Sequence, residues 1–228
     1  MHATGRRAAG PTGMTIGKAL RLLALASLLG ASPAALADTT ALDAYLSNVK
    51  TLRAEFTQVV TDGQRQVVQK AHGLLTIKRP GRFRWELTPE GGVAPQLMVA
   101  DGRNLWFYDQ DLEQVSVKSS AAALTATPAS LLSGDGKIGE FFDVSADGKS
   151  GGFDWVRVVP KRADADFREA RLAFKGKDAQ LKRMVLKDKL GQTVELEFLK
   201  SVRNAPVADA EVSFTPPAGA DLIGTPLP

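Results

Sequence analysis

The strongest constraint on the fold is an alternation of apolar and polar side chains with a period of two residues, which recurs in short segments along the chain. Phe83, Trp85 and Leu87 alternate with charged residues, and the segment 194–198 shows the same pattern. Because successive side chains of a strand point to opposite faces, each segment predicts a β-strand with one buried face. Asp-Gly pairs, which are typical of tight turns, separate several of the segments.

These segments predict a mainly β fold in which roughly nine to eleven strands follow one another as hairpins in an antiparallel sheet. Such a sheet either stacks on a second sheet or curls toward a barrel. The predicted strands cover residues 53–61, 73–79, 82–87, 97–100, 104–108, 112–118, 153–159, 169–174, 181–187 and 192–200.

Two predicted helices complete the α+β content. Leu42, Tyr45, Leu46 and Val49 recur at the spacing of one helix face, which predicts a short amphipathic helix before the first strand. The segment 127–134 has Thr at the N-cap position, Pro at the first helical position and Gly after the end, which predicts a second helix. Either helix can cover an opening or the concave face of the sheet.

The positive net charge of the sequence comes from its first residues. Lys and Arg number 29 against 25 Asp and Glu, and the excess consists of Arg6, Arg7, Lys18 and Arg21. No acidic residue precedes Asp38, so the remainder of the chain is neutral overall. Its composition therefore gives no support to nucleic-acid binding, which depends on clustered Lys and Arg with stacking aromatic residues.

The same leader predicts a secretory signal peptide over residues 1–37. Basic residues precede an apolar run from Leu22 to Leu36, and residues 35–37 form a small-x-small cleavage site. A retained membrane anchor is the alternative, but the run is shorter than the ~20 residues that span a bilayer. We expect an exported protein with a single domain over residues 38–228, and the absence of Cys excludes disulfides and thiolate metal sites.

Motifs that carry chemistry are few and weak. His72 is the only histidine after the leader, which argues against a zinc site or a catalytic triad. Residues 148–152 match G-x-S-x-G but lie in a Gly-rich turn, and Glu195 and Glu197 alternate with apolar residues as on a solvated sheet face. We therefore predict no enzyme activity, no metal and no cofactor.

Arg79 stands out because its strand parity matches that of Leu75 and Ile77, which places it on the apolar side. A guanidinium that is buried without partners is costly, so it must meet acceptors there. The alternative is that Arg79, at the end of its strand before Pro80, reaches water.

Several segments occur in an order and at a spacing that match a known family. They are Phe56-Thr57-Gln58, Lys78-Arg79-Pro80 with Phe83-x-Trp85, residues 99–108, Thr127-Pro128 and Phe214-Thr215-Pro216-Pro217. Together they resemble the LolA family of periplasmic lipoprotein carriers, and the resemblance spans essentially the whole chain after the leader.

The resemblance implies an incomplete, half-open antiparallel β-barrel of about eleven strands, with a lid of short helices over an apolar cavity. It implies a monomeric periplasmic chaperone that takes acylated lipoproteins from an ABC-type release complex in the inner membrane. Such a chaperone shields the acyl chains and delivers them to an outer-membrane receptor. It works without a cofactor and without being embedded in a membrane.

The resemblance further implies a lock, which is a set of hydrogen bonds between one strand end and the lid. Arg79 aligns with the arginine that bonds backbone carbonyls of the lid, at positions corresponding to Leu46, Leu132 and Ser133. We assign Leu131 to the same lid. The expected cavity wall, which binds the acyl chains, comprises Tyr45, Phe56, Leu75, Ile77, Phe83, Trp85, Leu87, Trp106 and Tyr108.

Two alternatives and one departure from the family stay open. A periplasmic lipid-sensing regulatory module has the same fold, although such modules usually carry a second domain or a lipidated Cys. A secreted hydrolase would need a general base that this sequence does not offer.

The central helix departs from the family in one respect. It carries Ala129 and Ser130 where better-known members have larger apolar residues, which predicts weaker or rearranged binding of acyl chains.

Overall fold

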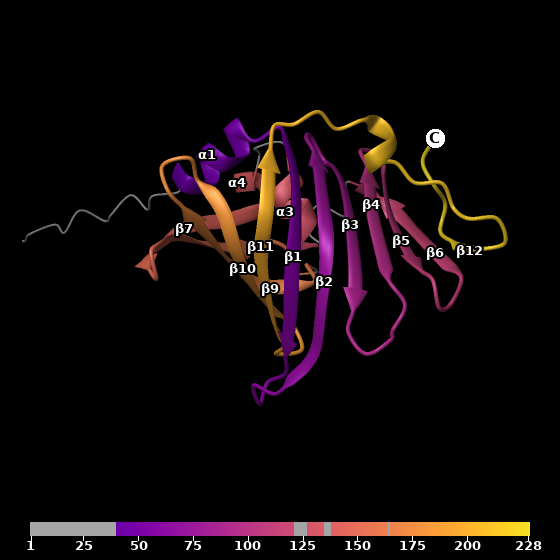
Figure 1. Cartoon of the computed structure of the whole chain (residues 1–228), viewed down its shortest axis with the longest axis horizontal. Helices are drawn as coiled ribbons and strands as arrows, with labels where there is room; N and C mark the ends of the chain where they lie inside the picture. The colour runs from indigo at the N-terminus through magenta and orange to yellow at the C-terminus, as the bar shows by residue number, and fades with distance from the viewer. Residues whose placement is uncertain (1–39, 121–126, 135–137, 164) are drawn as a thin grey trace, which may run out of the picture. The chain divides into compact units, whose positions relative to one another are not determined.

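The computed structural model describes residues 40–120, 127–134, 138–163 and 165–228, and the predicted signal peptide lies outside these residues. In them, twelve strands form one sheet in the order β12-β6-β5-β4-β3-β2-β1-β11-β10-β9-β8-β7 (Figure 1). The strands are β1 (Thr51–Thr61), β2 (Val67–Lys78), β3 (Arg82–Pro89), β4 (Gln96–Asp101), β5 (Asn104–Asp109), β6 (Gln114–Ser119), β7 (Phe142–Ser150), β8 (Phe153–Pro160), β9 (Phe167–Lys175), β10 (Gln180–Asp188), β11 (Thr193–Arg203) and β12 (Asp221–Ile223).

The sheet is open, because β7 and β12 are its two edges and do not pair with each other. Neighbouring strands are antiparallel except β12, which pairs in parallel with β6. The prediction of an incomplete antiparallel barrel is therefore confirmed. The predicted number of strands is too low, because a bulge between Ala146 and Lys149 interrupts the alternation of β7 and because β12 has only three residues.

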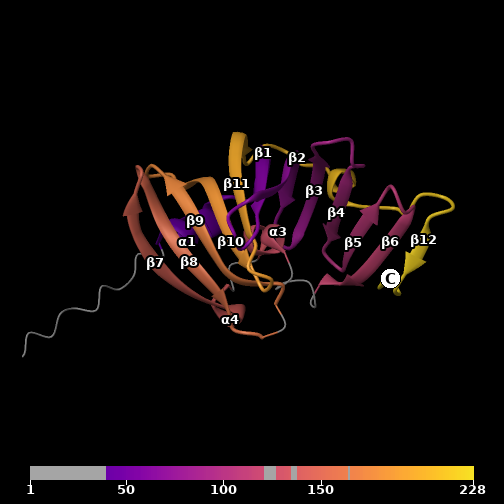
Figure 2. The same cartoon turned by 90° about the horizontal axis from the view of Figure 1, so that it is seen from below.

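Three helices of the described chain cover one face of the sheet, which we call the inner face. They are α1 (Thr40–Asn48), α3 (Pro128–Ser133) and α4 (Ile138–Phe141). They share one apolar core with inner-face side chains such as Phe56, Leu75 and Phe83. Helix α3 contacts β2 and β3, and α1 contacts β8 (Figure 2).

The apolar stripe that the sequence predicts for the first helix is confirmed. Leu42, Tyr45, Leu46 and Val49 are all buried in the inner-face core. A helix of nine residues is marginal by itself, so α1 depends on this packing for its stability. None of the helices within the described ranges has the length and apolar character needed to cross a bilayer.

The opposite face, which we call the outer face, carries a second apolar cluster over β4, β5 and β6. Val99, Trp106, Val115 and Val117 are buried there, while alternate residues of β4 and β5, namely Met98, Ala100, Leu105 and Phe107, belong to the inner core. Phe214, from the segment after β11, packs on this cluster. The C-terminal segment therefore covers an outer face that the sequence does not mark as buried.

This cluster overturns the prediction of Trp106 as a residue of the cavity wall, and it holds the ring of Tyr108 on the outer face. The rings of Trp106 and Tyr108 point to the outer face and pack on Phe214, at centroid distances of 5.7 and 6.0 Å. Leu105 and Phe107 instead belong to the inner core. Strand parity determines which residues share a face but not which face the helices cover, and here both faces are apolar.

Asp101 organises the turn between β4 and β5, where the sequence predicts one. Its Oδ1 accepts hydrogen bonds from the backbone N–H groups of Arg103 and Asn104, each at 2.8 Å. Its Oδ2 accepts one from Trp106 Nε1 at 2.8 Å. Burial alone would raise the pKa of this carboxyl, but the three donors outweigh burial and hold its pKa below the usual value.

The lowered pKa of Asp101 predicts a pH dependence of known sign. A carboxyl of this kind stabilises the fold above its unfolded pKa of ~3.9, and the contribution is lost as the pH falls through the folded pKa. We expect Asp101→Asn to be less stable than wild type at neutral pH and to lose less stability below about pH 4. Urea unfolding at a series of pH values measures both effects. Parallel curves for the two proteins would contradict this role of Asp101.

Candidate functional site

The motifs of catalytic appearance do not form a site. Glu195 and Glu197 are exposed on β11, which confirms the prediction of a solvated face. The G-x-S-x-G match, residues 148–152, forms the hairpin between β7 and β8 rather than a strand-to-helix elbow. His72 lies on the exposed face of β2.

Helix α3 begins where the sequence predicts, with Thr127 as its N-cap. Thr127 Oγ1 accepts a hydrogen bond from Ser130 N at 3.1 Å, and Ser130 Oγ accepts one from Thr127 N at 3.2 Å, which completes a capping box. The small polar residue at position 130 therefore serves the start of the helix. Leu131, Leu132 and Ser133 are buried, so the other end of α3 is also held in the core.

Arg79 joins the ends of two helices. It directly follows β2, and its Nη1 donates hydrogen bonds to Leu46 O at 2.9 Å and to Gly134 O at 3.4 Å. Its Nη2 donates to Leu132 O at 2.5 Å. The last carbonyls of a helix lack partners within the helix and form the negative end of its dipole, so a guanidinium at this place satisfies them.

Tyr45 lies beneath this guanidinium. Arg79 Cζ is 4.8 Å from the centroid of the Tyr45 ring, within the range of a cation–π interaction. Burial lowers the pKa of Arg79 and raises the pKa of Tyr45, yet a guanidinium stays charged in proteins. Arg79 Nε and the Tyr45 hydroxyl have no hydrogen-bond partner among the described residues. Of the two orientations that the sequence leaves open, the structure therefore has the buried one.

The predicted contact between Arg79 and the Ser133 carbonyl is wrong. Ser133 O accepts a hydrogen bond from Gly81 N at 2.9 Å, and the Gly134 carbonyl accepts from Arg79 instead. The chain leaves the helix at Gly134 with φ −54° and ψ 164°, so its carbonyl does not follow the direction of the helical ones. The turn between β2 and β3 thus contacts the end of α3 through Arg79 and Gly81.

A pocket of about 330 Å³ lies between β3–β5 and the N-terminal end of α3. We call it the Trp85 pocket. Arg79 binds the other end of α3, so a displacement of this one helix changes both the pocket and the Arg79 contacts. The apolar residues of the pocket include Trp85, Leu87, Met98, Phe107 and Ala129, and Gln58, Gln96 and Thr127 border it.

The predicted wall residues divide between this pocket and the core. Trp85 and Leu87 line the pocket, and Tyr108 borders it although its ring packs on the outer face. The Phe56 ring centroid is 4.4 Å from that of Trp85, so the pocket wall is continuous with the core. The remaining predicted residues are buried in the core between the helices and the inner face. They are Tyr45 on α1 and, on the sheet, Phe56, Leu75, Ile77 and Phe83.

Two residues of the pocket wall, Met98 on β4 and Phe107 on β5, were not predicted from the sequence. Met98 is opposite Trp85 in the β3–β4 register, and Phe107 is opposite Met98 in the β4–β5 register. The signal that identifies them is this pairing, because residues opposite each other share a face. Once Trp85 is assigned to the inner face, the other two follow.

Comparison with known proteins gives a consistent result. Residues 47–215 match the family model described as outer membrane lipoprotein carrier protein LolA. The chain is 40% identical over 180 residues to an outer-membrane lipoprotein carrier protein of Dechloromonas aromatica, an alignment that covers 79% of this chain and 84% of that one. It is 40% identical over 194 residues to the protein of the same name from Chromobacterium violaceum, with coverage of 85% and 90%.

Among solved structures, the fold resembles that of an uncharacterized conserved protein from Thermus thermophilus. The TM-score is 0.53 at 15% identity, and the alignment covers 81% of this chain and 97% of that chain. At this identity the likeness concerns the fold alone. The family match includes β1 to β11, α3 and Arg79.

Proposed function

This chain belongs to the LolA family of outer membrane lipoprotein carrier proteins, and on that premise we propose that it carries acylated lipoproteins across the periplasm. In this proposal, residues 1–37 are a signal peptide removed on export, and residues 38–228 act as one monomeric carrier domain. Cargo comes from an ABC-type release complex in the inner membrane and leaves to an outer-membrane receptor. The carrier performs no catalysis and needs no cofactor.

The cargo itself explains why a carrier is needed. Acyl chains in water cost about 0.8 kcal/mol per exposed CH₂, so a lipoprotein cannot cross an aqueous compartment unshielded. The Trp85 pocket, at about 330 Å³, is at the lower end of the ~300–1,000 Å³ typical of ligand pockets. We infer that several acyl chains fit only when the helices move away from the inner face and expose the core beneath them.

The observation that carries the proposal is the set of contacts made by Arg79. Its guanidinium binds carbonyls of α1 and α3, two of the helices that cover the inner face. In the proposed mechanism these bonds favour the closed, empty carrier. Acyl chains bind only the open state, so loading breaks the Arg79 bonds. The fraction of open carrier then rises according to how much more tightly the lipid binds the open state than the closed state. Because breaking the Arg79 bonds costs free energy, the carrier binds lipid less tightly than the buried apolar area alone implies. A receptor that has no such bonds to break binds the lipid more tightly and receives it.

The proposal predicts that an acylated ligand changes the fluorescence of Trp85. Substituting Phe for Trp106 and Trp155 leaves Trp85 as the only tryptophan of the three. Titration with a triacylated lipopeptide should then shift or quench the emission in a saturable way, because Trp85 lines the pocket.

The matched control keeps Trp155 as the only tryptophan. Its neighbour Val156 is buried in the core, so Trp155 faces the outer side of β8, where Arg171 Cζ is 4.8 Å from its ring centroid. Its emission should not respond to the lipopeptide. Absence of saturable binding to either protein would contradict the carrier function. Saturable binding that leaves Trp85 emission unchanged would contradict the assignment of this pocket.

A further inference from the structure

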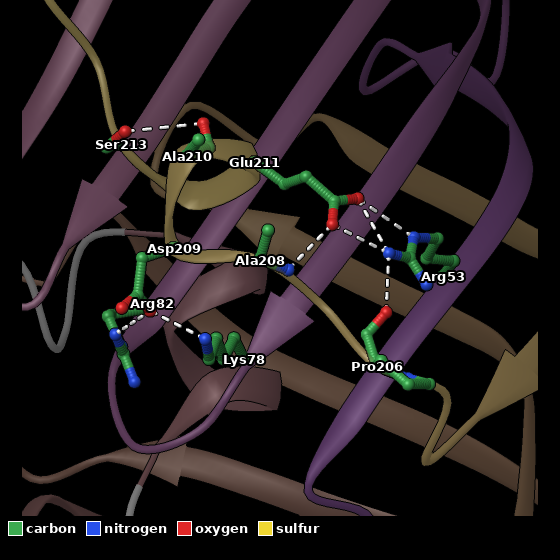
Figure 3. A network of polar contacts seen from close by, with 9 residues as sticks. All are labelled: Arg53, Lys78, Arg82, Pro206, Ala208, Asp209, Ala210, Glu211 and Ser213. Carbon is green, nitrogen blue, oxygen red and sulfur yellow. Dashed lines mark hydrogen bonds and ion pairs between the residues drawn. The ribbon is translucent and has the colours of Figure 1, made fainter.

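The C-terminal segment is fixed to the outer face by polar contacts around the 3-10 helix η1 (Asp209–Val212) (Figure 3). The Glu211 carboxylate accepts hydrogen bonds from Arg53 Nε and Nη2 and from Ala208 N, at 2.7 to 3.1 Å. Arg53 Nη2 also donates to Pro206 O at 2.8 Å. These contacts attach η1 to β1.

Asp209, the first residue of η1, contacts two other strands. Its Oδ1 accepts hydrogen bonds from Lys78 Nζ at 2.6 Å and from Arg82 Nη1 at 2.7 Å (Figure 3). Lys78 is the last residue of β2 and Arg82 is the first residue of β3. One carboxylate therefore bridges the two ends of the turn 79–81, and the hydrogen bond from Lys78 lowers its pKa, which favours the charged form.

The same turn is held from the inner side by the helices. Arg79 binds carbonyls of α1 and α3, and Gly81 N donates to Ser133 O at 2.9 Å. On the outer side, Lys78 and Arg82 are directly opposite each other in the β2–β3 register. Like charges in this position destabilise strand pairing, so a carboxylate that bonds both cations relieves repulsion at the base of the turn.

We propose that Asp209 is a positioning residue for Arg79: by bonding Lys78 and Arg82, it holds the turn 79–81 where the guanidinium reaches the helix carbonyls. The C-terminal segment, although it lies on the outer face, is thereby coupled to the closure of the inner face. The inference rests on the proposed function, because it takes the Arg79 bonds as what keeps the carrier closed.

The test compares Asp209→Asn with wild type by hydrogen exchange of the Gly81 amide. This amide is bonded to Ser133 O, so its exchange reports separation of the turn from α3. The Asp209 side chain is 76% exposed, and exposed ion pairs are weak, so we expect exchange to accelerate by about two- to fivefold. Binding of an apolar dye to the empty carrier should rise by a similar factor. Both differences should shrink in about 1 M salt, which screens exposed charges.

Three further proteins separate positioning from general loosening. Asp154→Asn removes one carboxylate from an exposed ion pair of the β7–β8 hairpin and should leave Gly81 exchange unchanged. Asp209→Glu keeps the charge and should restore slow exchange at least in part. In an Arg79→Leu background, Asp209→Asn should add no further dye binding, because the group that it positions is gone.

The outcomes distinguish this inference from the proposed function. Equal Gly81 exchange in Asp209→Asn and wild type overturns the positioning role. An acceleration that amides in the middle of β2 share equally overturns it as well, since that result means general loosening. If Arg79→Leu itself leaves Gly81 exchange, dye binding and lipopeptide binding unchanged, the lock of the proposed mechanism fails instead. If the wild-type protein shows no saturable lipopeptide binding, the proposed carrier function fails.

Discussion

Replacing Arg79 with leucine is expected to slow the transfer of a loaded lipoprotein to its receptor by about tenfold or more, while the sheet stays folded. In the proposed mechanism, the bonds from Arg79 to Leu46 O and Leu132 O favour the closed, empty carrier. Each charged hydrogen bond contributes about 1.5–3 kcal/mol, and ~1.4 kcal/mol is tenfold in an equilibrium constant. Without these bonds the cargo no longer competes with closure, so it stays bound longer.

Transfer is measured with a carrier that holds a fluorescent triacylated lipopeptide and is mixed with an excess of receptor. Arg84→Leu is the matched control, because Arg84 pairs with Glu86 on the outer face of β3 at 2.5 Å. It should transfer cargo at the wild-type rate. Thermal unfolding followed by circular dichroism verifies that both variants are folded. A folded Arg79→Leu variant that releases cargo as fast as wild type would rule out the lock.

The parts of the fold that depend on local burial could be predicted from the sequence. The stripe of Leu42, Tyr45, Leu46 and Val49 predicts α1 correctly, because one covered helix face leaves a regular pattern. The placement of Arg79 on the buried side follows from its parity with Leu75 and Ile77, although parity alone does not identify its acceptors. Those acceptors come from α1 and α3, and only the tertiary structure brings the two helices together.

What the sequence could not predict depends on pairing between distant segments. Trp106 and Phe107 are equally apolar neighbours on β5, and the face of each depends on what covers β5 from either side. Phe214 packs on the outer face of β5 although it lies more than a hundred residues later in the sequence, and no local pattern in the sequence predicts this contact. The contact of Asp209 with both ends of the β2–β3 turn is of the same kind.

A single methyl group at Gly73 is expected to be strongly destabilising. Gly73 lies on β2 between Phe56 on β1 and Leu87 on β3, and the Phe56 ring lies across it toward Trp85. A Cβ added at Gly73 would be 2.1 Å from the Glu86 carbonyl oxygen and 2.4 Å from Phe56 Cζ. Because one of these atoms belongs to the backbone, the strands themselves must shift. We expect Gly73→Ala to lower the free energy of unfolding by about 3 kcal/mol, at the upper end of overpacking effects.

Urea unfolding measures this loss, and Gly139→Ala is the matched control. Gly139 lies in α4, and a Cβ added there meets no atom within 4 Å, so the substitution should stabilise the protein by up to about 1 kcal/mol through helix propensity. If the free energy of unfolding falls in Gly73→Ala and rises in Gly139→Ala, the close approach of Phe56 and β3 to Gly73 decides the effect. The displaced Phe56 ring should also move Trp85, so the variant should bind lipopeptide more weakly even where it is fully folded. Wild-type stability and binding in Gly73→Ala would mean that the wall of the Trp85 pocket does not depend on this contact.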